Sequence, residues 1–141
     1  MNDTINLVGE VQILLNNEVV LEKKNLIVQV GKNFLASAVI SNSTSPFNAM
    51  AIGTGTNAAA LGDTTLQTEI ARAAFTTSSV STNVVSLSNT YAAGTGTGAV
   101  TEAGIFNNTT SGGTLLSHVV FSAINKGAAD TLTINWTITV G

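Results

Sequence analysis

The sequence contains no cysteine, one proline and one histidine, and only 9% of its 141 residues are charged. Without cysteine the chain has neither disulfides nor thiolate metal sites. Its formal net charge is −3 and its one adjacent basic pair is Lys23-Lys24, which excludes the clustered basic surface that nonspecific nucleic-acid binding requires. No apolar run is long enough to cross a membrane, and the first residues do not resemble a signal peptide. We therefore expect synthesis in the cytoplasm and neither a nucleic-acid nor a membrane partner.

The polarity of the chain comes from Thr, Ser and Asn, while 44% of its residues are hydrophobic. Threonine is β-branched, and Ser and Asn hydrogen-bond nearby backbone, so this composition suits half-exposed strands and turns. Soluble domains usually carry more surface charge, which keeps their copies apart. The composition therefore indicates a surface that a partner covers; the alternative is a secreted or extracellular β-domain.

The C-terminal segment alternates apolar and polar residues, the period-two pattern of a strand with one buried face. Its apolar positions, all expected in the core, are Leu132, Ile134, Trp136, Ile138 and Val140. Comparable patterns predict seven more strands, over residues 5–13, 19–21, 26–30, 72–80, 83–92, 101–106 and 115–124. Helical spacing over residues 31–41 predicts one short helix capping the core, followed by a loop over 41–48 that holds the proline.

About eight short strands with Gly, Asn and Ser turns predict an all-β fold, a single-domain antiparallel β-sandwich spanning residues 1–141. Jelly-roll-like and immunoglobulin-like arrangements are both open, and the strand count favours the jelly roll. Residues 1–30 hold several strand-forming runs at a chain end, where an extended segment can pair with the edge of a neighbouring molecule. We expect them to take part in assembly contacts.

The stretch Gly53-Thr54-Gly55-Thr56 and its near copy over residues 94–98 raise the question of a phosphate-binding loop. A Walker loop needs a Lys-Ser/Thr pair after its last glycine, and neither copy has one. A dinucleotide site needs a third glycine inside a βαβ unit, which this chain lacks. We expect the glycines to supply positive φ at sharp turns instead.

The other residues that could form a catalytic or binding site do not indicate one. His118 has no acidic neighbour in the sequence, so we expect a partly exposed structural histidine rather than a metal ligand or a catalytic base. The acidic residues Asp63, Glu69, Glu102 and Asp130 stand singly, although folding could bring two of them together as a glycosidase pair. Glu69 and Arg72 are spaced for an ion pair, within one chain or between chains. The aromatic residues fall on presumed inward positions. We assign no catalytic, cofactor-binding or metal-binding residue, no cofactor and no enzymatic activity.

Three stretches carry a resemblance to a known group: MAIGTGTNAAALGDTTLQTEIAR, AAGTGTGAVTEAGIFNNTTSGGTLLSHVVF and INKGAADTLTINWTITVG. Together, over residues 49–141, they resemble small virion proteins of tailed bacteriophages, which range from capsid decoration (cement) proteins to tail-fibre-like proteins. Residues 1–48 carry little of the resemblance.

The resemblance implies a virion structural protein on the capsid exterior that binds the assembled major-capsid-protein shell and stabilises it by bridging capsomers. It also implies a homo-oligomer, for which we favour a dimer over a trimer because two-fold interfaces are the commonest. The loops over residues 57–63 and 107–113 would settle between capsomers. Two alternatives are a tail-fibre or baseplate component and a carbohydrate-binding β-sandwich module. Fibre chains usually show repeats, and carbohydrate modules usually expose aromatic side chains.

Overall fold

The computed structural model describes residues 4–41 and 45–141, and this part of the chain contains nine strands and one short helix. The elements are β1 (Leu7–Leu15), β2 (Glu18–Ile27), α1 (Gln29–Ala38), β3 (Ala49–Gly53), β4 (Glu69–Ala74), β5 (Thr77–Ser81), β6 (Val84–Tyr91), β7 (Gly98–Phe106), β8 (Leu115–Lys126) and β9 (Leu132–Val140). Every strand pair is antiparallel, so the predicted all-β class with one short helix is confirmed. The predicted loop over 41–48 lies partly outside the described residues.

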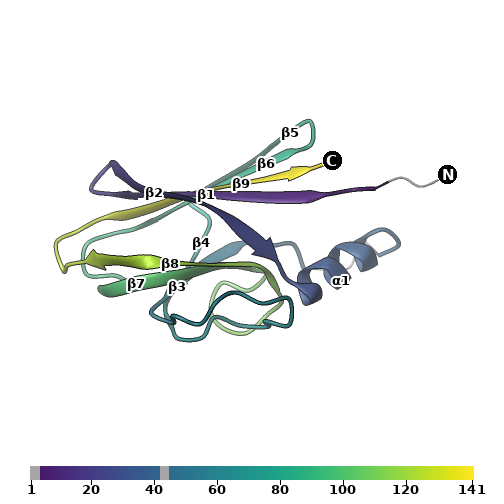
Figure 1. Cartoon of the computed structure of the whole chain (residues 1–141). Helices are drawn as coiled ribbons and strands as arrows, with labels where there is room; N and C mark the ends of the chain where they lie inside the picture. Colours follow the sequence, from purple (N-terminus) through teal and green to yellow (C-terminus); the bar gives the residue numbers. More distant parts are fainter. Residues whose placement is uncertain (1–3, 42–44) are drawn as a thin grey trace.

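The nine strands form one continuous sheet in the order β4-β3-β7-β8-β2-β1-β9-β6-β5. The sheet curls into two facing layers (Figure 1). We call the strands β2, β1, β9, β6 and β5 the β1 layer, and β8, β7, β3 and β4 the β7 layer. β2 joins the two, because it pairs with β1 over most of its length and with β8 only at Leu26 and Ile27. A jelly-roll topology is not established by this order, since all nine strands belong to one sheet.

The main core lies between the layers and includes the strand that the sequence marks most clearly. Leu132, Ile134, Trp136 and Ile138 of β9 are all buried, as their alternation predicted. Val140 is 38% exposed, so its predicted place in the core is wrong. It is the last residue of β9 and lines an unfilled hollow of about 170 Å³.

A series of buried hydrogen bonds crosses this core. Asn89, which interrupts the apolar face of β6, is itself buried and donates hydrogen bonds to the Ala73 carbonyl (3.2 Å) and the Tyr91 hydroxyl (3.3 Å). The Tyr91 hydroxyl donates in turn to the Met50 carbonyl (2.6 Å) on β3. These bonds tie β6 in one layer to β4 and β3 in the other, so the interruption in the pattern is a link between the layers.

The segment predicted as one strand over residues 72–80 is two strands, and that prediction is wrong. β4 and β5 lie at opposite ends of the sheet order, in different layers. The backbone N–H of Phe75 donates to the Asn48 carbonyl in the β7 layer, and that of Thr76 donates to the Ser88 carbonyl in the β1 layer. The chain therefore changes layers between two adjacent residues, which the periodicity of the sequence does not show.

Two further strand predictions differ from the structure. The predicted runs over residues 19–21 and 26–30 belong together in β2, whose last residue is Ile27. β3 was not among the predicted strands, and all five of its residues are buried. A strand covered on both faces has no apolar–polar alternation, so its pattern is a short apolar run.

The helix is confirmed, two residues earlier than predicted, but it covers little of the core. Gly31 is the buried residue of α1, and a Cβ there would lie 2.5 Å from the Leu116 carbonyl oxygen of β8. The helix thus contacts the sheet near its start, through Gly31 and the partly buried Val30, and extends away from it (Figure 1). Leu35, further along the helix, is 37% exposed, so this part of the helix buries little apolar surface.

The N-terminal strand is an interior strand of the sheet. β1 pairs with β2 on one side and with β9 on the other, in both cases along nearly its whole length. Its backbone groups are therefore already engaged, so β1 itself has no open edge for a neighbouring molecule. The first three residues lie outside the described part of the chain.

A second, smaller core lies on the outer side of the β7 layer. It comprises the buried residues Val28, Ala51, Leu66, Phe106 and Leu115. Two connections cover it, residues 54–68 between β3 and β4 and residues 107–114 between β7 and β8; both run beneath the β7 layer in Figure 1. The outer side of one layer is thus covered by the chain itself.

Candidate functional site

The glycine-rich stretch after β3 opens a loop, residues 54–68, that encloses a carboxylate of its own chain. Glu102 of β7 is fully buried beneath this loop. Its Oε2 accepts hydrogen bonds from the backbone N–H groups of Gly55 (2.7 Å) and Thr68 (2.8 Å), and its Oε1 accepts one from Gln67 (2.9 Å). Charge-assisted bonds of this kind compensate the desolvation of a buried carboxylate. The loop therefore cradles an anion, and the anion is an internal side chain.

Gly53 and Gly55 are glycines because this carboxylate and its loop approach so closely. A Cβ on Gly55 would lie 2.3 Å from Glu102 Oε2, and a Cβ on Gly53 would lie 2.3 Å from the Thr68 carbonyl oxygen. Neither residue has a positive φ, so the role predicted for them is wrong.

The near copy of the stretch behaves as predicted. Gly94 and Gly96, between β6 and β7, have φ values of +82° and +66°, a region that residues with a Cβ rarely adopt. Two similar sequences therefore contain glycine for different physical reasons, close approach in one and backbone conformation in the other.

His118 of β8 joins the buried carboxylate to a second acid. Its Nε2 lies 2.9 Å from Glu102 Oε1, and its Nδ1 lies 2.7 Å from Asp63 Oδ2 in the covering loop. Carboxylate oxygens only accept, so both ring nitrogens must carry a proton to bond both acids. The imidazolium form is assigned from this network. We refer to these three residues as the Asp63–His118–Glu102 cluster.

The environment keeps both acids of the cluster ionised. Burial raises the pKa of Glu102, but the hydrogen bonds from three backbone N–H groups and from His118 outweigh burial and hold the pKa below its ordinary value of 4.5. Burial likewise raises the pKa of Asp63, and the bonds from the Ala60 N–H and from His118 again lower it below 3.8.

The cluster contains the residue types of a catalytic acid–histidine pair, but neither ring nitrogen of its histidine is free. A catalytic histidine needs one ring nitrogen free to take a proton from a nucleophile, and both nitrogens of His118 are bonded to acids. Glu102 is enclosed by donors from its own chain. The geometry therefore fits a latch that holds residues 54–68 against the sheet.

The sequence prediction for His118 is wrong on two points. The side chain is 3% exposed rather than partly exposed, and it has two acidic neighbours. Asp63 and Glu102 are 55 and 16 residues away along the chain, so no local spacing shows the contact. One signal was available: Glu102 is the one charged residue in the predicted strand over residues 101–106.

The predicted ion pair between Glu69 and Arg72 is confirmed, within one chain. Arg72 Nη2 and Nε donate to the two carboxylate oxygens at 2.7 and 3.0 Å. Arg72 Nη1 also donates to the carbonyls of Asn108 (3.0 Å) and Gly112 (2.8 Å), and the guanidinium lies 3.8 Å from the Phe106 ring centroid. Arg72 therefore ties the second covering loop to β4. Both loops predicted to settle between capsomers are bound to their own sheet.

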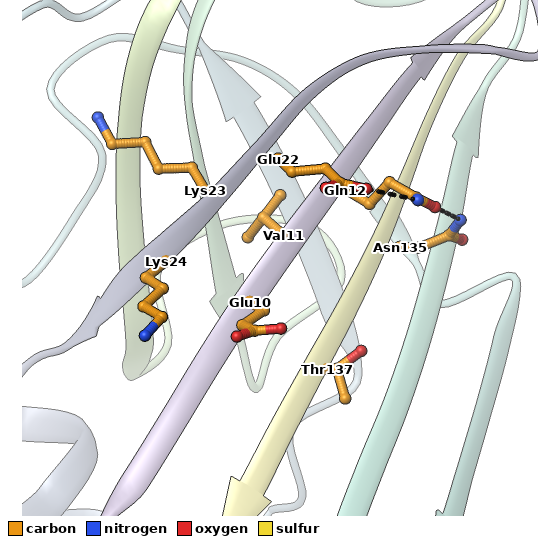
Figure 2. Close-up of a pocket in the computed structure, with 8 residues that line it drawn as sticks. All are labelled: Glu10, Val11, Gln12, Glu22, Lys23, Lys24, Asn135 and Thr137. Carbon is orange, nitrogen blue, oxygen red and sulfur yellow. Dashed lines mark hydrogen bonds between the residues drawn. The ribbon is translucent and has the colours of Figure 1, made fainter.

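The outer side of the β1 layer is not covered by any described segment. We call it the bare face; its outward residues include Glu22, Lys24, Glu10, Gln12, Thr133, Asn135, Thr137, Ser86, Ser88, Thr90, Thr77, Ser79 and Ser81. Figure 2 draws the eight residues that line a hollow of about 440 Å³ at β1, β2 and β9. They include outward residues of this face and also Val11 and Lys23, whose positions alternate with the outward ones.

Hydrogen bonds between side chains cross the bare face from strand to strand. Gln12 donates to Glu22 (3.1 Å), Asn135 donates to Gln12 (3.2 Å), and Ser88 donates to Asn135 (2.9 Å). The first two bonds are the dashed lines of Figure 2. This ladder links β2, β1, β9 and β6 and holds the amide groups in fixed orientations. The part of the face that these bonds cross is thus polar and ordered.

The two lysines of the adjacent basic pair make different contacts. Lys24 lies on the bare face opposite Glu10, whereas Lys23 donates to the Val120 carbonyl of β8 (2.6 Å). Lys23 therefore bridges the gap where β2 and β8 separate. Both lysines line the hollow of Figure 2 together with Glu10 and Glu22, so the hollow carries charges of both signs.

The fold and the Asp63–His118–Glu102 cluster define a β-protein with a covering loop bound on one side and a bare sheet face on the other. Comparisons with protein-family models, with curated proteins and with solved structures gave no match. Within residues 4–41 and 45–141 there is no group of three or more His, Cys, Asp or Glu side chains arranged to hold a metal ion. The same residues include no helix with the length and apolar character needed to span a membrane.

Proposed function

We propose that this chain is a structural protein of a tailed-bacteriophage virion, a decoration (cement) protein that binds the outside of the assembled major-capsid-protein shell. The observation that carries the proposal is the bare face. The chain covers the outer side of its β7 layer with two tied loops, and it leaves the outer side of the β1 layer open. An open sheet face of five strands offers a wide area for a protein partner.

The chemistry of the bare face suits a neutral protein surface. Most of its outward residues are Ser, Thr, Asn or Gln, and its three charges, Glu10, Glu22 and Lys24, include both signs. Such a face makes many hydrogen bonds without the electrostatic cost of desolvating a single-sign patch. A protein that binds only the assembled shell stabilises that shell by mass action.

The resemblance of residues 49–141 to phage virion proteins supports the same assignment. The N-terminal segment contributes in a different way from that first expected. Glu10 and Gln12 of β1, with Glu22 and Lys24 of β2, supply side chains to the bare face, whereas the backbone of β1 stays within its own sheet. Residues 1–30 would thus take part in assembly through side chains.

A steric variant on the bare face tests the proposal. Ser86 is exposed on β6, and Ser86→Arg would place a large charged side chain in the middle of the face. We expect this variant to fold normally and to co-sediment at least about tenfold more weakly with shells of the major capsid protein encoded in the same genome. The matched control is Thr65→Arg, at an exposed position of the loop that covers the opposite layer.

The outcomes separate the alternatives. Binding lost in Ser86→Arg and kept in Thr65→Arg supports attachment through the bare face. The reverse pattern would show that the covering loops make the contact. If the wild-type protein does not bind shells but co-sediments with purified tails, the result would contradict the decoration role and support a tail role.

A further inference from the structure

β5 is an edge strand with an open side. Among the described residues it pairs only with β6, from Thr77↔Ser88 to Ser81↔Val84 without a register shift. Alternate residues of an antiparallel strand direct their N–H and C=O groups away from the partner, so one side of β5 presents free backbone groups. All five side chains are exposed, and β5 with β6 forms a hairpin at the edge of its layer (Figure 1).

β5 lacks the features that normally protect a sheet edge. Edges are usually blocked by charged side chains, proline or bulges. The sequence of β5 is Thr-Ser-Ser-Val-Ser, which has none of these. The opposite edge, β4, carries Glu69 and Arg72, and its pairing with β3 has a register shift at Ile52/Gly53. One edge of this sheet is therefore protected and the other is open.

We propose that β5 pairs antiparallel with β5 of a second copy of this chain, joining two β1 layers into one sheet across a two-fold axis. The axis would pass beside Ser79, so that Thr77 opposes Ser81 and Ser78 opposes Val80 of the other copy. This register sets no charged residue against another, and isologous pairing needs only one self-complementary strand. The inference concerns free protein and does not depend on capsid attachment.

The pairing also extends an apolar row of the core. Val80 of β5 is 71% exposed and lies directly opposite Val85 of β6, which in turn lies opposite Ile138 of β9. These side chains share the inward side of the β1 layer. The second copy would place its Ser78 beside each Val80 and so reduce the exposure of both Val80 side chains.

Charge substitutions at Val80 test the pairing. Val80→Lys and Val80→Glu each place like charges near the two-fold axis, so each variant should dimerise at least about tenfold more weakly than the wild type. An equimolar mixture of the two variants should recover dimers, because opposite charges then lie diagonally across the axis. Sedimentation velocity over a series up to about 1 mM protein reports the association. Val19→Lys, at a position of β2 that is 51% exposed, is the matched control.

Each result decides the proposal. Monomeric variants, a dimeric control and a dimeric mixture would support it. A wild type that stays monomeric, single variants that still dimerise, a control that loses the dimer, or a mixture that remains monomeric would overturn it. Circular dichroism of each variant confirms that an exposed substitution leaves the fold intact. Shell binding is measured separately, so loss of the dimer and loss of capsid attachment are distinguished.

Discussion

Gly55 shows how one residue can be fixed by a distant side chain. Its N–H donates to Glu102, and its missing Cβ leaves room for the same carboxylate. Gly55→Ala should force the loop and the carboxylate apart and lower the free energy of unfolding by about 1–3 kcal/mol, the usual cost of overpacking a filled site. Chemical denaturation measures this change.

Gly62 provides the matched control within the same loop. A Cβ at Gly62 meets nothing within 4 Å, and its φ is not positive. Gly62→Ala should therefore leave stability unchanged or raise it by up to about 1 kcal/mol, because alanine restricts the unfolded chain. Equal losses in the two variants would contradict the close-approach explanation.

At the scale of elements, the position of β1 between β2 and β9 determines how an N-terminal truncation affects folding. Removing residues 1–12 would delete most of β1 and expose unpaired backbone on both neighbours. It would also remove Val11, which is buried in the main core. We expect this truncated protein to lose cooperative thermal unfolding and to be recovered mostly as insoluble material.

A shorter deletion is the control. Removing residues 1–5 leaves all of β1, since the strand begins at Leu7. Ile5 is 72% exposed, so its loss costs little apolar burial. This protein should unfold cooperatively within a few degrees of the full chain, and a folded 1–12 deletion would show that β1 is dispensable.

At the scale of the whole molecule, the buried acid makes stability depend on pH. The pKa of Glu102 is lowered in the folded state, so the unfolded chain takes up a proton first as the pH falls below about 4.5. The stabilisation by its carboxylate is therefore complete above this pH and is lost toward lower pH. Asp63 and Asp130, whose pKa values are also lowered, add to the same trend.

Glu102→Gln isolates this contribution. The variant should be about 3 kcal/mol less stable at pH 6, because it removes one partner of a buried charged network. Its free energy of unfolding should also fall less steeply than that of the wild type between about pH 5 and pH 3. Glu18→Gln, which changes an exposed acid at the start of β2, controls for the loss of one charge. Parallel curves for Glu102→Gln and the wild type would contradict the role given to the cluster.

The sequence by itself determined the features that depend on neighbours along the chain. Alternation placed β9 and most of its core residues, and spacing placed the short helix, because strand and helix periods are local properties. The positive φ at Gly94 and Gly96 likewise followed from a turn motif. The low charge predicts that a partner covers part of the surface, and this stays a prediction. The low charge does not indicate which part of the surface that is.

Only the tertiary structure decided the features that depend on contacts across the chain. His118 meets Asp63 and Glu102 because β7 and β8 pair and a loop folds back over both; their sequence separations carry no such signal. The split of residues 72–80 into β4 and β5 depends on which carbonyl each backbone N–H reaches. The bare face and the open edge of β5 are set by the order of strands in the sheet, since a strand's own sequence does not say which neighbours or loops will cover it.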